Sequence, residues 1–391
     1  MNRIAIVGAK RTAQGGFQGQ FSATHATQLG SAAIAGALNQ AGLDAAQIEE
    51  VLMGCVLPAG LGQAPARQAA LGAGIPVSVP CTTLNKVCGS AMKAVMLGCD
   101  MINAGSANTV IAGGMESMTN APYLLPGARA GYRMGHHEVV DHMFFDGLQN
   151  PYDKKLMGEF AEQCAEKYAF TRDIQDNFAI ASVNRAMAAM EKGTFKLEIA
   201  PVTVHGRRGA TVIDSDEEPP RCDLAKVPKL RPAFSKDGTV TAANASKISD
   251  GAAAMALCSE AQASESQLEV LGHIVGQAGF AQEPEWFTTA PTGAIRKLLE
   301  KMDWRPDDVD LYEINEAFAV VTLSAMHELG LDHDKVNVNG GACALGHPLG
   351  ASGCRIAVSL LYALRERGLK RGIAALCIGG GEATAIALEA A

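Results

Sequence analysis

Two segments of the chain, beginning at Ala33 and Ala294, show one pattern of apolar and polar residues that aligns without a gap. In each segment, apolar residues first recur with the i, i+3, i+4 spacing of an amphipathic helix. These positions are Ile34, Ala37, Leu38 and Ala41 in the first segment and Ile295, Leu298, Leu299 and Met302 in the second. A short acidic turn and an alternating, strand-like run follow in both. The repeat favours a duplicated domain, and the alternative is chance resemblance between two ordinary helix–strand units.

The two halves stay similar further along the chain. In the first, a helical run after Cys88 precedes a strand at 109–112 and then two glycines. In the second, a helix at about 352–368 precedes a strand at 373–378 and then three glycines. Strands that alternate with helices of this length predict an α/β fold with mostly parallel sheets.

The stretch 119–245, between the two halves, is rich in proline and turn residues. It contains one strongly helical segment, Asp173–Glu191, which a capping signal at Thr171 opens. A length of 391 residues suits two or three domains. We therefore predict an N-terminal domain of residues 1–118 plus 246–268, an inserted loop domain of residues 119–245, and a C-terminal domain of residues 269–391.

Charge and cysteine content narrow the class of protein. A net charge of −8 argues against nucleic acid or an anionic membrane surface as the main partner, but leaves room for an anionic small ligand. The first residues lack the regions of a signal peptide, and no apolar run reaches the ~18 residues of a membrane helix. The ten cysteines are therefore expected to be free thiols in a reducing cytoplasm, most of them buried.

Cys88 lies where a predicted strand gives way to a helix, and Gly89-Ser90-Ala91 follows it directly. A free thiol has a pKa of about 8.5, so a catalytic cysteine needs a helix N-terminus or an adjacent base. The predicted helix would stabilise a thiolate at this position. Taken alone, the segment fits a buried structural thiol equally well.

Three further residues lie at similar junctions. His347, in a turn before a helix, suits a neutral imidazole that takes the Cys88 proton, or else a histidine satisfied by turn backbone. Cys377 ends a strand before three glycines, whose N–H groups can approach a ligand. Asn315 follows a strand and suits either polarisation of a carbonyl or capping of the next helix.

Together these segments resemble the thiolase family, over a stretch that runs from Arg3 to the C-terminus. The matching motifs are Asn85–Ala91 around Cys88, Asn315-Glu316-Ala317-Phe318, Gly346-His347-Pro348, Cys377 with its glycines, and the runs that begin at Leu230 and Ala242. The resemblance is closest to the acetyl-CoA acetyltransferase branch. It implies a five-layered α-β-α-β-α fold of two duplicated βαβαβαββ halves, with a loop domain inserted in the first.

The resemblance also implies a role for each motif residue. Cys88 is the acylated nucleophile, His347 activates it, and Cys377 exchanges a proton with the α-carbon of an acetyl group. One oxyanion site consists of His347 and a water held on Asn315. The other consists of the backbone N–H groups of Cys88 and Gly379. No metal or redox cofactor is implied, because the substrate itself carries coenzyme A.

The loop domain is expected to bind coenzyme A. Arg221 and the nearby Lys226, Lys229 and Arg231 suit the nucleotide phosphates, or else form ordinary solvated surface. Ser246 matches a position that contacts the pantetheine arm in thiolases. The other binding residues expected here are Leu148, Met157 and Phe318. Adjacent histidines usually point apart, so no metal site is expected at His136 and His137.

The expected reaction is the reversible condensation of two acetyl-CoA to acetoacetyl-CoA and CoA, by a homodimer or homotetramer. Leu156 precedes Met157, where acetoacetyl-CoA-specific thiolases often carry a histidine, so a broader 3-ketoacyl-CoA thiolase is the main alternative. A non-catalytic acyl-CoA-binding protein on the same fold is a second. A condensing ketoacyl synthase fits less well, because it usually pairs one cysteine with two histidines or with a histidine and an asparagine.

Overall fold

The computed structural model describes residues 3–206 and 209–391, and it contains two similar groups of strands. The first group has the order β4-β3-β5-β11-β1, and the second has the order β13-β14-β15-β12. The strands of the first group are β1 (Ile4–Thr12), β3 (Glu50–Gly54), β4 (Cys81–Leu84), β5 (Thr109–Ser117) and β11 (Ser249–Ser259). Those of the second are β12 (Gly272–Ala281), β13 (Leu311–Ile314), β14 (Arg371–Ile378) and β15 (Glu382–Ala390).

The directions of pairing repeat in the two groups. β3 is parallel to β4 and β5, whereas β11 is antiparallel to β5 and β1. Likewise, β13 is parallel to β14, whereas β15 is antiparallel to β14 and β12. A parallel bridge between Tyr312 and Val336 lies where β4 lies in the first group. The shared order confirms that the two halves are duplicated.

The prediction of mostly parallel sheets is wrong, because each group mixes both directions. The turn Gly379–Gly381 between β14 and β15 shows why: it is too short for the crossover that a parallel pair requires. The two groups also join each other, since Ile4–Ile6 of β1 pairs antiparallel with Gly272–Ile274 of β12.

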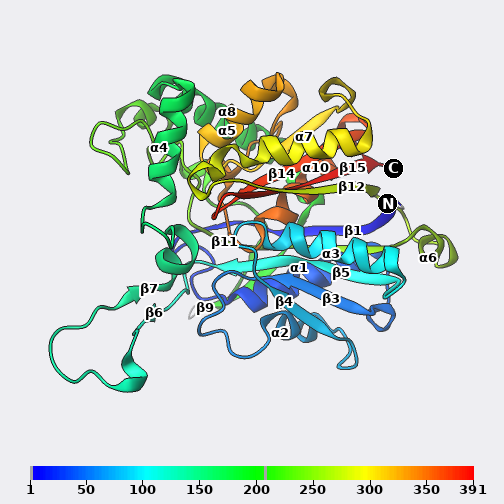
Figure 1. Ribbon diagram of the computed structural model, residues 1–391. Helices are drawn as coiled ribbons and strands as arrows, with labels where there is room; N and C mark the ends of the chain where they lie inside the picture. Colours follow the sequence, from blue (N-terminus) through cyan, green and yellow to red (C-terminus); the bar gives the residue numbers. More distant parts are fainter. Residues whose placement is uncertain (1–2, 207–208) are drawn as a thin grey trace.

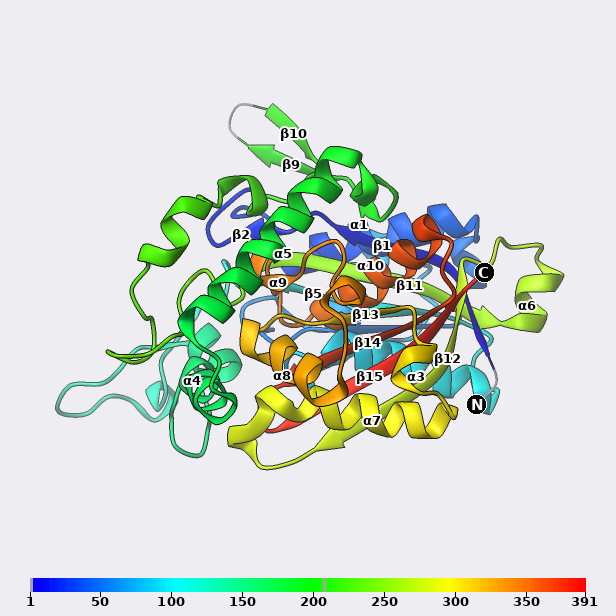
Figure 2. The ribbon, with the colours of Figure 1, turned by 90° about the horizontal axis from the view of Figure 1, so that it is seen from above.

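Helices cover both faces of each strand group and complete five layers (Figures 1 and 2). In β1, Ile4 and Ile6 face the central helices while Ala5 and Val7 face an outer layer, as the two-residue period of a strand requires. The predicted α-β-α-β-α arrangement is confirmed. The outer helices of the first half are α1 (Ala26–Ala41) and α2 (Pro65–Gly72), the central helices are α3 (Ser90–Ala104) and α10 (Ser352–Arg367), and the outer helices of the second half are α7 (Ala290–Met302) and α8 (Ala319–Leu329).

The sequence repeat corresponds to α1 and α7 with the turns and strands that follow them. Each helix ends at a left-handed residue, Gly42 (φ 64°) and Asp303 (φ 53°). A single 3₁₀ turn comes next in both halves, at Ala45–Gln47 and Pro306–Asp308, and leads into β3 and β13. The alternation of helix, turn and strand read from the sequence therefore describes the same unit twice.

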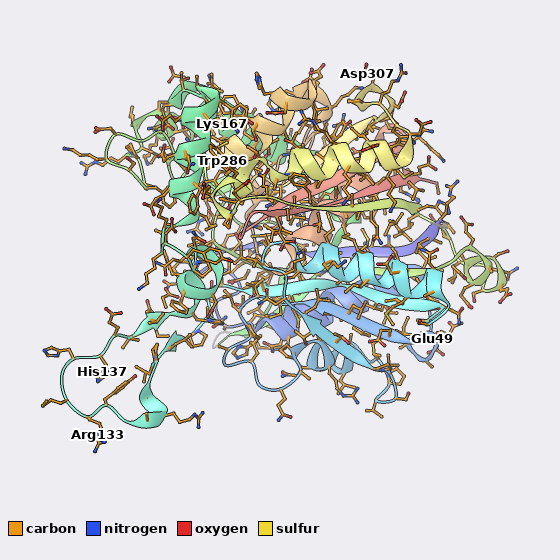
Figure 3. The ribbon with its side chains drawn as sticks, viewed as in Figure 1. Glu49, Arg133, His137, Lys167, Trp286 and Asp307 are labelled. Carbon is orange, nitrogen blue, oxygen red and sulfur yellow. The ribbon has the colours of Figure 1, made fainter. Side chains whose placement is uncertain are left out.

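The chain between β5 and β11 leaves the strand groups and forms most of the left side of the molecule in Figure 1. A long loop between β6 and β7 extends away from the body, and Arg133 and His137 lie on it (Figure 3). Within the described ranges, no group of three or more His, Cys, Asp and Glu side chains is arranged to hold a metal ion. The elements of this excursion are β6 (Tyr123–Leu124), β7 (Val140–Asp141), a π-helix (Met143–Leu148), α4 (Met157–Tyr168), α5 (Arg172–Lys192), β8 (Ile199–Ala200), β9 (Val202–Gly206) and β10 (Gly209–Ile213).

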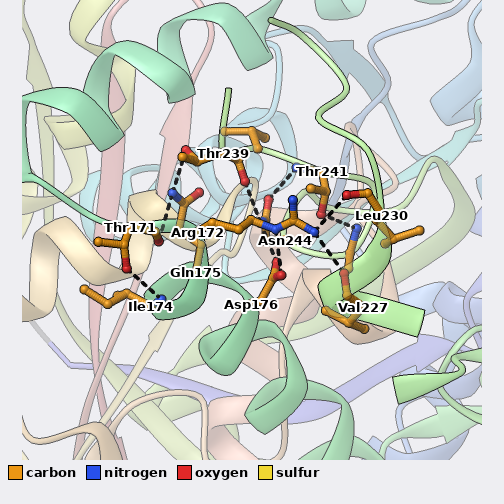
Figure 4. A network of polar contacts seen from close by, with 12 residues as sticks. Thr171, Arg172, Ile174, Gln175, Asp176, Val227, Leu230, Thr239, Thr241 and Asn244 are labelled. Atoms are coloured by element: carbon orange, nitrogen blue, oxygen red, sulfur yellow. Dashed lines mark hydrogen bonds and ion pairs between the residues drawn. The ribbon is translucent and has the colours of Figure 1, made fainter. Parts of the chain in front are cut away.

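Helix α5 closely matches the helix predicted at Asp173–Glu191, and Thr171 caps it by accepting a hydrogen bond from the N–H of Ile174 at 3.3 Å. Its first turns hold the returning chain through the network in Figure 4. Asp176 accepts from Arg172 Nε at 2.6 Å and from Asn244 Nδ2 at 2.9 Å. This network fixes the segment 239–244, in which Thr241 and Ala242 line a cavity.

The remaining elements are short: β2 (Gly15–Gly16), α6 (Glu260–Glu265) and α9 (Ala342–Leu345). Among the residues that the structure describes, no helix is both long enough and apolar enough to span a lipid bilayer.

Candidate active site

Cys88 lies in a tight turn between β4 and α3. Val87 before it takes a left-handed backbone (φ 47°), and Asn85 Oδ1 accepts a hydrogen bond from its N–H at 2.8 Å. Ser90 closes the turn: its Oγ donates to the Val87 carbonyl at 2.6 Å and accepts from the Lys86 N–H at 2.8 Å. The turn buries Cys88, which is 9% exposed, two residues before the first residue of α3.

The resting Cys88 is a neutral thiol. Burial raises its pKa to about 11, although hydrogen bonds from the N–H groups of Gly379 and of Cys88 itself act in the opposite direction. The effect of burial on the pKa exceeds that of the two N–H groups, and stabilisation of a thiolate by the start of α3 stays a prediction. A base must take the proton before Cys88 can react.

The turn that begins at Cys377 packs directly against Cys88. The N–H of Gly379 reaches the Cys88 sulfur, and a Cβ on Gly89 would collide with Ile378. Cys377 is fully buried at the end of β14, and burial followed by the charge on Cys88 raises its pKa well above the usual value. The structure therefore brings the first-half cysteine and the second-half cysteine together at one point.

His347 lies in the loop between α9 and α10, and its Nδ1 is 2.5 Å from Ser352 Oγ. The Ser352 hydroxyl has one proton, and it donates that proton to the Pro348 carbonyl at 2.9 Å. With the hydroxyl donating there, we infer that Nδ1 carries the imidazole proton and donates it to Ser352. Nε2 is left as a buried acceptor without a hydrogen-bond partner among the described residues. Burial, with the charge of Arg355, lowers the pKa of His347 to about 3, so the ring is neutral.

Asn315 directly follows β13 and is fully buried. Its backbone N–H donates to the Ala375 carbonyl at 3.0 Å, and its Oδ1 accepts from Arg355 Nη2 at 3.4 Å. Its Nδ2 has no hydrogen-bond partner among the described residues. Asn315 is thus an available donor, as His347 Nε2 is an available acceptor, and both come from the second half of the chain.

A cavity of about 440 Å³ opens beside His347, and Cys88, Asn315 and Cys377 are not among its lining residues. His347 lines it, together with all five residues predicted to bind coenzyme A, which are Leu148, Met157, Arg221, Ser246 and Phe318. Met157 also connects the cavity to the buried cysteines, since its Sδ lies 3.6 Å from the position of a Cβ on Gly379. The sequence therefore identified residues from four distant segments that share one cavity.

Of the four basic residues predicted to bind the nucleotide phosphates, only Arg221 lines this cavity. Arg221 is 59% exposed and pairs with Glu217 at 3.0 Å and with Glu218 at 3.3 Å. Lys247 lines the cavity too, although it was not among the residues predicted to bind coenzyme A. The other three predicted phosphate-binding residues, Lys226, Lys229 and Arg231, are not among the lining residues.

Two buried glutamates, which sequence reasoning left without a role, hold the loops of the site. Glu116 accepts from the N–H groups of Val56, Leu57 and Gly350 at 3.0, 3.1 and 2.9 Å. It thereby anchors the loop that carries His347.

Glu316 accepts from Ser182 Oγ at 2.7 Å, Asn337 Nδ2 at 2.9 Å and the Cys343 N–H at 3.0 Å. It joins α5 of the excursion to the loops on either side of the site. The signal available in the sequence was the position of the two glutamates: Glu316 directly follows Asn315, and Glu116 lies two residues after the second glycine of a pair near the end of a strand.

Comparison with known proteins agrees with the geometry. Residues 4–261 match the thiolase N-terminal domain and residues 268–390 the thiolase C-terminal domain. The chain is 54% identical over 389 residues to acetyl-CoA acetyltransferase 2 of Arabidopsis thaliana, covering 99% of this chain and 96% of that protein. It is 50% identical over 390 residues to acetyl-CoA acetyltransferase of Pseudomonas aeruginosa, covering 99% of each.

A solved structure shows the same fold. The crystal structure of the Bacillus anthracis acetyl-CoA acetyltransferase superimposes with a TM-score of 0.98 at 40% sequence identity, over 100% of this chain and 99% of that one. Both family domains and the whole-length likeness lead to one conclusion: the chain belongs to the thiolase family.

Proposed function

We propose that this protein is an acetyl-CoA C-acetyltransferase, which condenses two acetyl-CoA to acetoacetyl-CoA and CoA and also runs the reverse thiolysis. The observation that carries the proposal is the contact of Cys88 with the Cys377–Gly379 turn beside a cavity that a neutral His347 lines. The names and whole-length similarity of the relatives support the same activity.

In the first half-reaction, His347 Nε2 takes the proton of Cys88, and the thiolate attacks the thioester carbon of acetyl-CoA. The N–H groups of Cys88 and Gly379 stabilise the oxyanion that forms on this carbon, because they lie at the attacking sulfur. The carbon–sulfur bond to coenzyme A then breaks. Coenzyme A leaves with the proton that His347 received, and the acetyl group stays on Cys88.

In the second half-reaction, Cys377 gives its proton to His347 and then takes an α-proton from a second acetyl-CoA. The resulting enolate oxygen lies between His347 and a water on Asn315, and its carbon attacks the acetyl carbon on Cys88. The Cys88 thiolate leaves and recovers the proton from His347. One good oxyanion donor is worth about 3–4 kcal/mol, so two such sites lower the barriers of both steps substantially.

Coenzyme A arrives as part of the substrate in this scheme, and no separate cofactor takes part. The cavity would hold the pantetheine arm against Leu148, Met157, Ser246 and Phe318. Arg221 lines the same cavity and pairs with Glu217. Arg221 would exchange part of its pairing with two glutamates for contact with the nucleotide phosphates.

The test is incubation with acetyl-CoA followed by mass spectrometry of peptides. One acetyl group is expected on the peptide that contains Cys88, and hydroxylamine should remove it because the bond is a thioester. A Cys88→Ala variant that keeps full condensation activity would overturn the proposal.

A broader 3-ketoacyl-CoA thiolase is the second candidate. Leu156 favours it, because this apolar residue lines the cavity where acetoacetyl-CoA-specific members of the family often carry a histidine. Comparing thiolysis of acetoacetyl-CoA with that of a homologue of about six to ten carbons separates the two. A clear preference for the longer chain would favour the second candidate.

We propose that the protein works in the cytoplasm as a homodimer or homotetramer, in fatty-acid metabolism. The ten cysteines are all free in the structure, which suits a reducing compartment. Light scattering on the purified protein measures the assembly directly.

A further inference from the structure

Arg355 is a fully buried arginine in the first turn of α10. Its residue exposure is 1%, and its helix neighbours Cys354 and Ile356 are apolar and fully buried. A buried guanidinium costs several kcal/mol unless its donors are bonded. The charge of Arg355 helps to lower the pKa of His347, but no step of the proposed reaction has yet used its hydrogen bonds.

The guanidinium spans two side chains at the end of β13. Its Nη1 donates to Glu313 Oε1 at 3.2 Å, and its Nη2 donates to Asn315 Oδ1 at 3.4 Å. Glu313 and Asn315 are two residues apart, so they lie on the same face of the strand, toward α10. The fixed fork of an arginine is suited to such a pair, whereas the single ammonium of a lysine is not.

This contact decides which way the Asn315 amide is turned. A guanidinium has donors only, so the amide must turn its oxygen toward Arg355. The NH₂ end then points away, fully buried and without a partner among the described residues. Without Arg355, rotation by about 180° would present an oxygen where the reaction needs a donor.

We propose that Arg355 is a positioning residue for the carbon–carbon bond step, because it holds the Asn315 amide with its N–H groups toward the enolate oxygen. This inference rests on the proposed function. The inference predicts different effects on the two half-reactions. The oxyanion of the first half-reaction is bound by the N–H groups of Cys88 and Gly379, and Arg355 contacts neither of them.

Arg355→Lys tests the proposal with the charge retained. Exchange of labelled CoA into acetyl-CoA reports the first half-reaction alone. Exchange of the acetyl-CoA α-hydrogens with D₂O, and acetoacetyl-CoA formation, report the second. The variant is expected to keep CoA exchange near the wild-type rate while the other two rates fall about 10²-fold, the effect of losing one oxyanion donor.

Arg365→Lys is the matched control. Arg365 lies on the same helix, but its side chain is 31% exposed and pairs with Glu269 at 3.0 Å. All three rates are expected to stay at the wild-type level. A second control is the double variant Asn315→Ala/Arg355→Lys, which should be no slower than Asn315→Ala, because Arg355 acts through Asn315.

If Arg355→Lys does not fold, Glu313→Gln/Arg355→Met removes both buried charges, including the one that lowers the pKa of His347. CoA exchange by this variant is then the baseline, and the other two rates should fall further than CoA exchange does. Equal loss of CoA exchange and condensation would overturn the proposal, as would unchanged rates or additive losses in the Asn315 double variant. Absence of CoA exchange in the wild-type protein would instead refute the proposed function itself.

Discussion

The hydroxyl of Ser352 fixes the tautomer of His347, so Ser352→Ala should slow the reaction without unfolding the protein. The substitution removes the acceptor that Nδ1–H bonds at 2.5 Å. A buried donor left without a partner costs about 1–3 kcal/mol, and the competing tautomer, which has the proton on Nε2, becomes more populated. At about 1.4 kcal/mol per tenfold in rate, kcat/KM should fall roughly 5- to 150-fold.

Two measurements check this reasoning. Steady-state condensation by Ser352→Ala is compared with that by Ser359→Ala, which removes another buried hydroxyl of α10, one that contacts Glu198 at 3.3 Å. Nitrogen NMR of labelled histidine then shows whether Nδ1 of His347 carries the proton in the wild-type protein. An Nε2–H tautomer there, or a Ser352→Ala loss no larger than that of Ser359→Ala, would refute the assignment.

Three further predictions follow from the same geometry. Because burial raises the pKa of Cys88 to about 11, its alkylation by iodoacetamide should rise about tenfold per pH unit from about pH 7 to about pH 9, and a plateau in that range would contradict the buried thiol. Arg221→Ala should raise KM for acetyl-CoA about fivefold at unchanged kcat, whereas Lys226→Ala, outside the cavity, should change neither. Gly381→Ala should lower the free energy of unfolding by about 1–3 kcal/mol in urea titration, because φ is 88° and a Cβ would meet backbone at 2.8 Å. Gly380→Ala is its control, since φ is 95° there but nothing lies within 4 Å, so an equal loss would refute the steric argument.

Local patterns predicted the repeated unit and the helix α5 because each depends on neighbours in the chain. The i, i+3, i+4 apolar stripe of α7 and the Thr171 cap are properties of single segments. Strand direction was not predictable in the same way. Whether β11 runs parallel or antiparallel to β5 depends on a long excursion that carries no directional pattern.

Only those residues of the candidate site that lie in recognisable motifs could be predicted from the sequence. Cys88, His347 and Cys377 stand out because each lies at a junction among small residues. Arg355 lies inside a helix that carries two further arginines, so nothing in the sequence distinguishes it. Its partners, Glu313 in β13 and Asn315 directly after it, are far from Arg355 in the chain, so only the packed structure reveals these contacts. The raised pKa of Cys88 was missed for a related reason, since burial depends on every layer around it.

The most direct test of the central claim is to treat the Cys377→Ala variant with acetyl-CoA and follow both products. The account predicts that this variant accumulates a stable acetyl group on Cys88 and forms no acetoacetyl-CoA, because the nucleophile remains and the α-carbon base is gone. Condensation at the wild-type rate, or a Cys88 peptide that stays unmodified, would contradict the account.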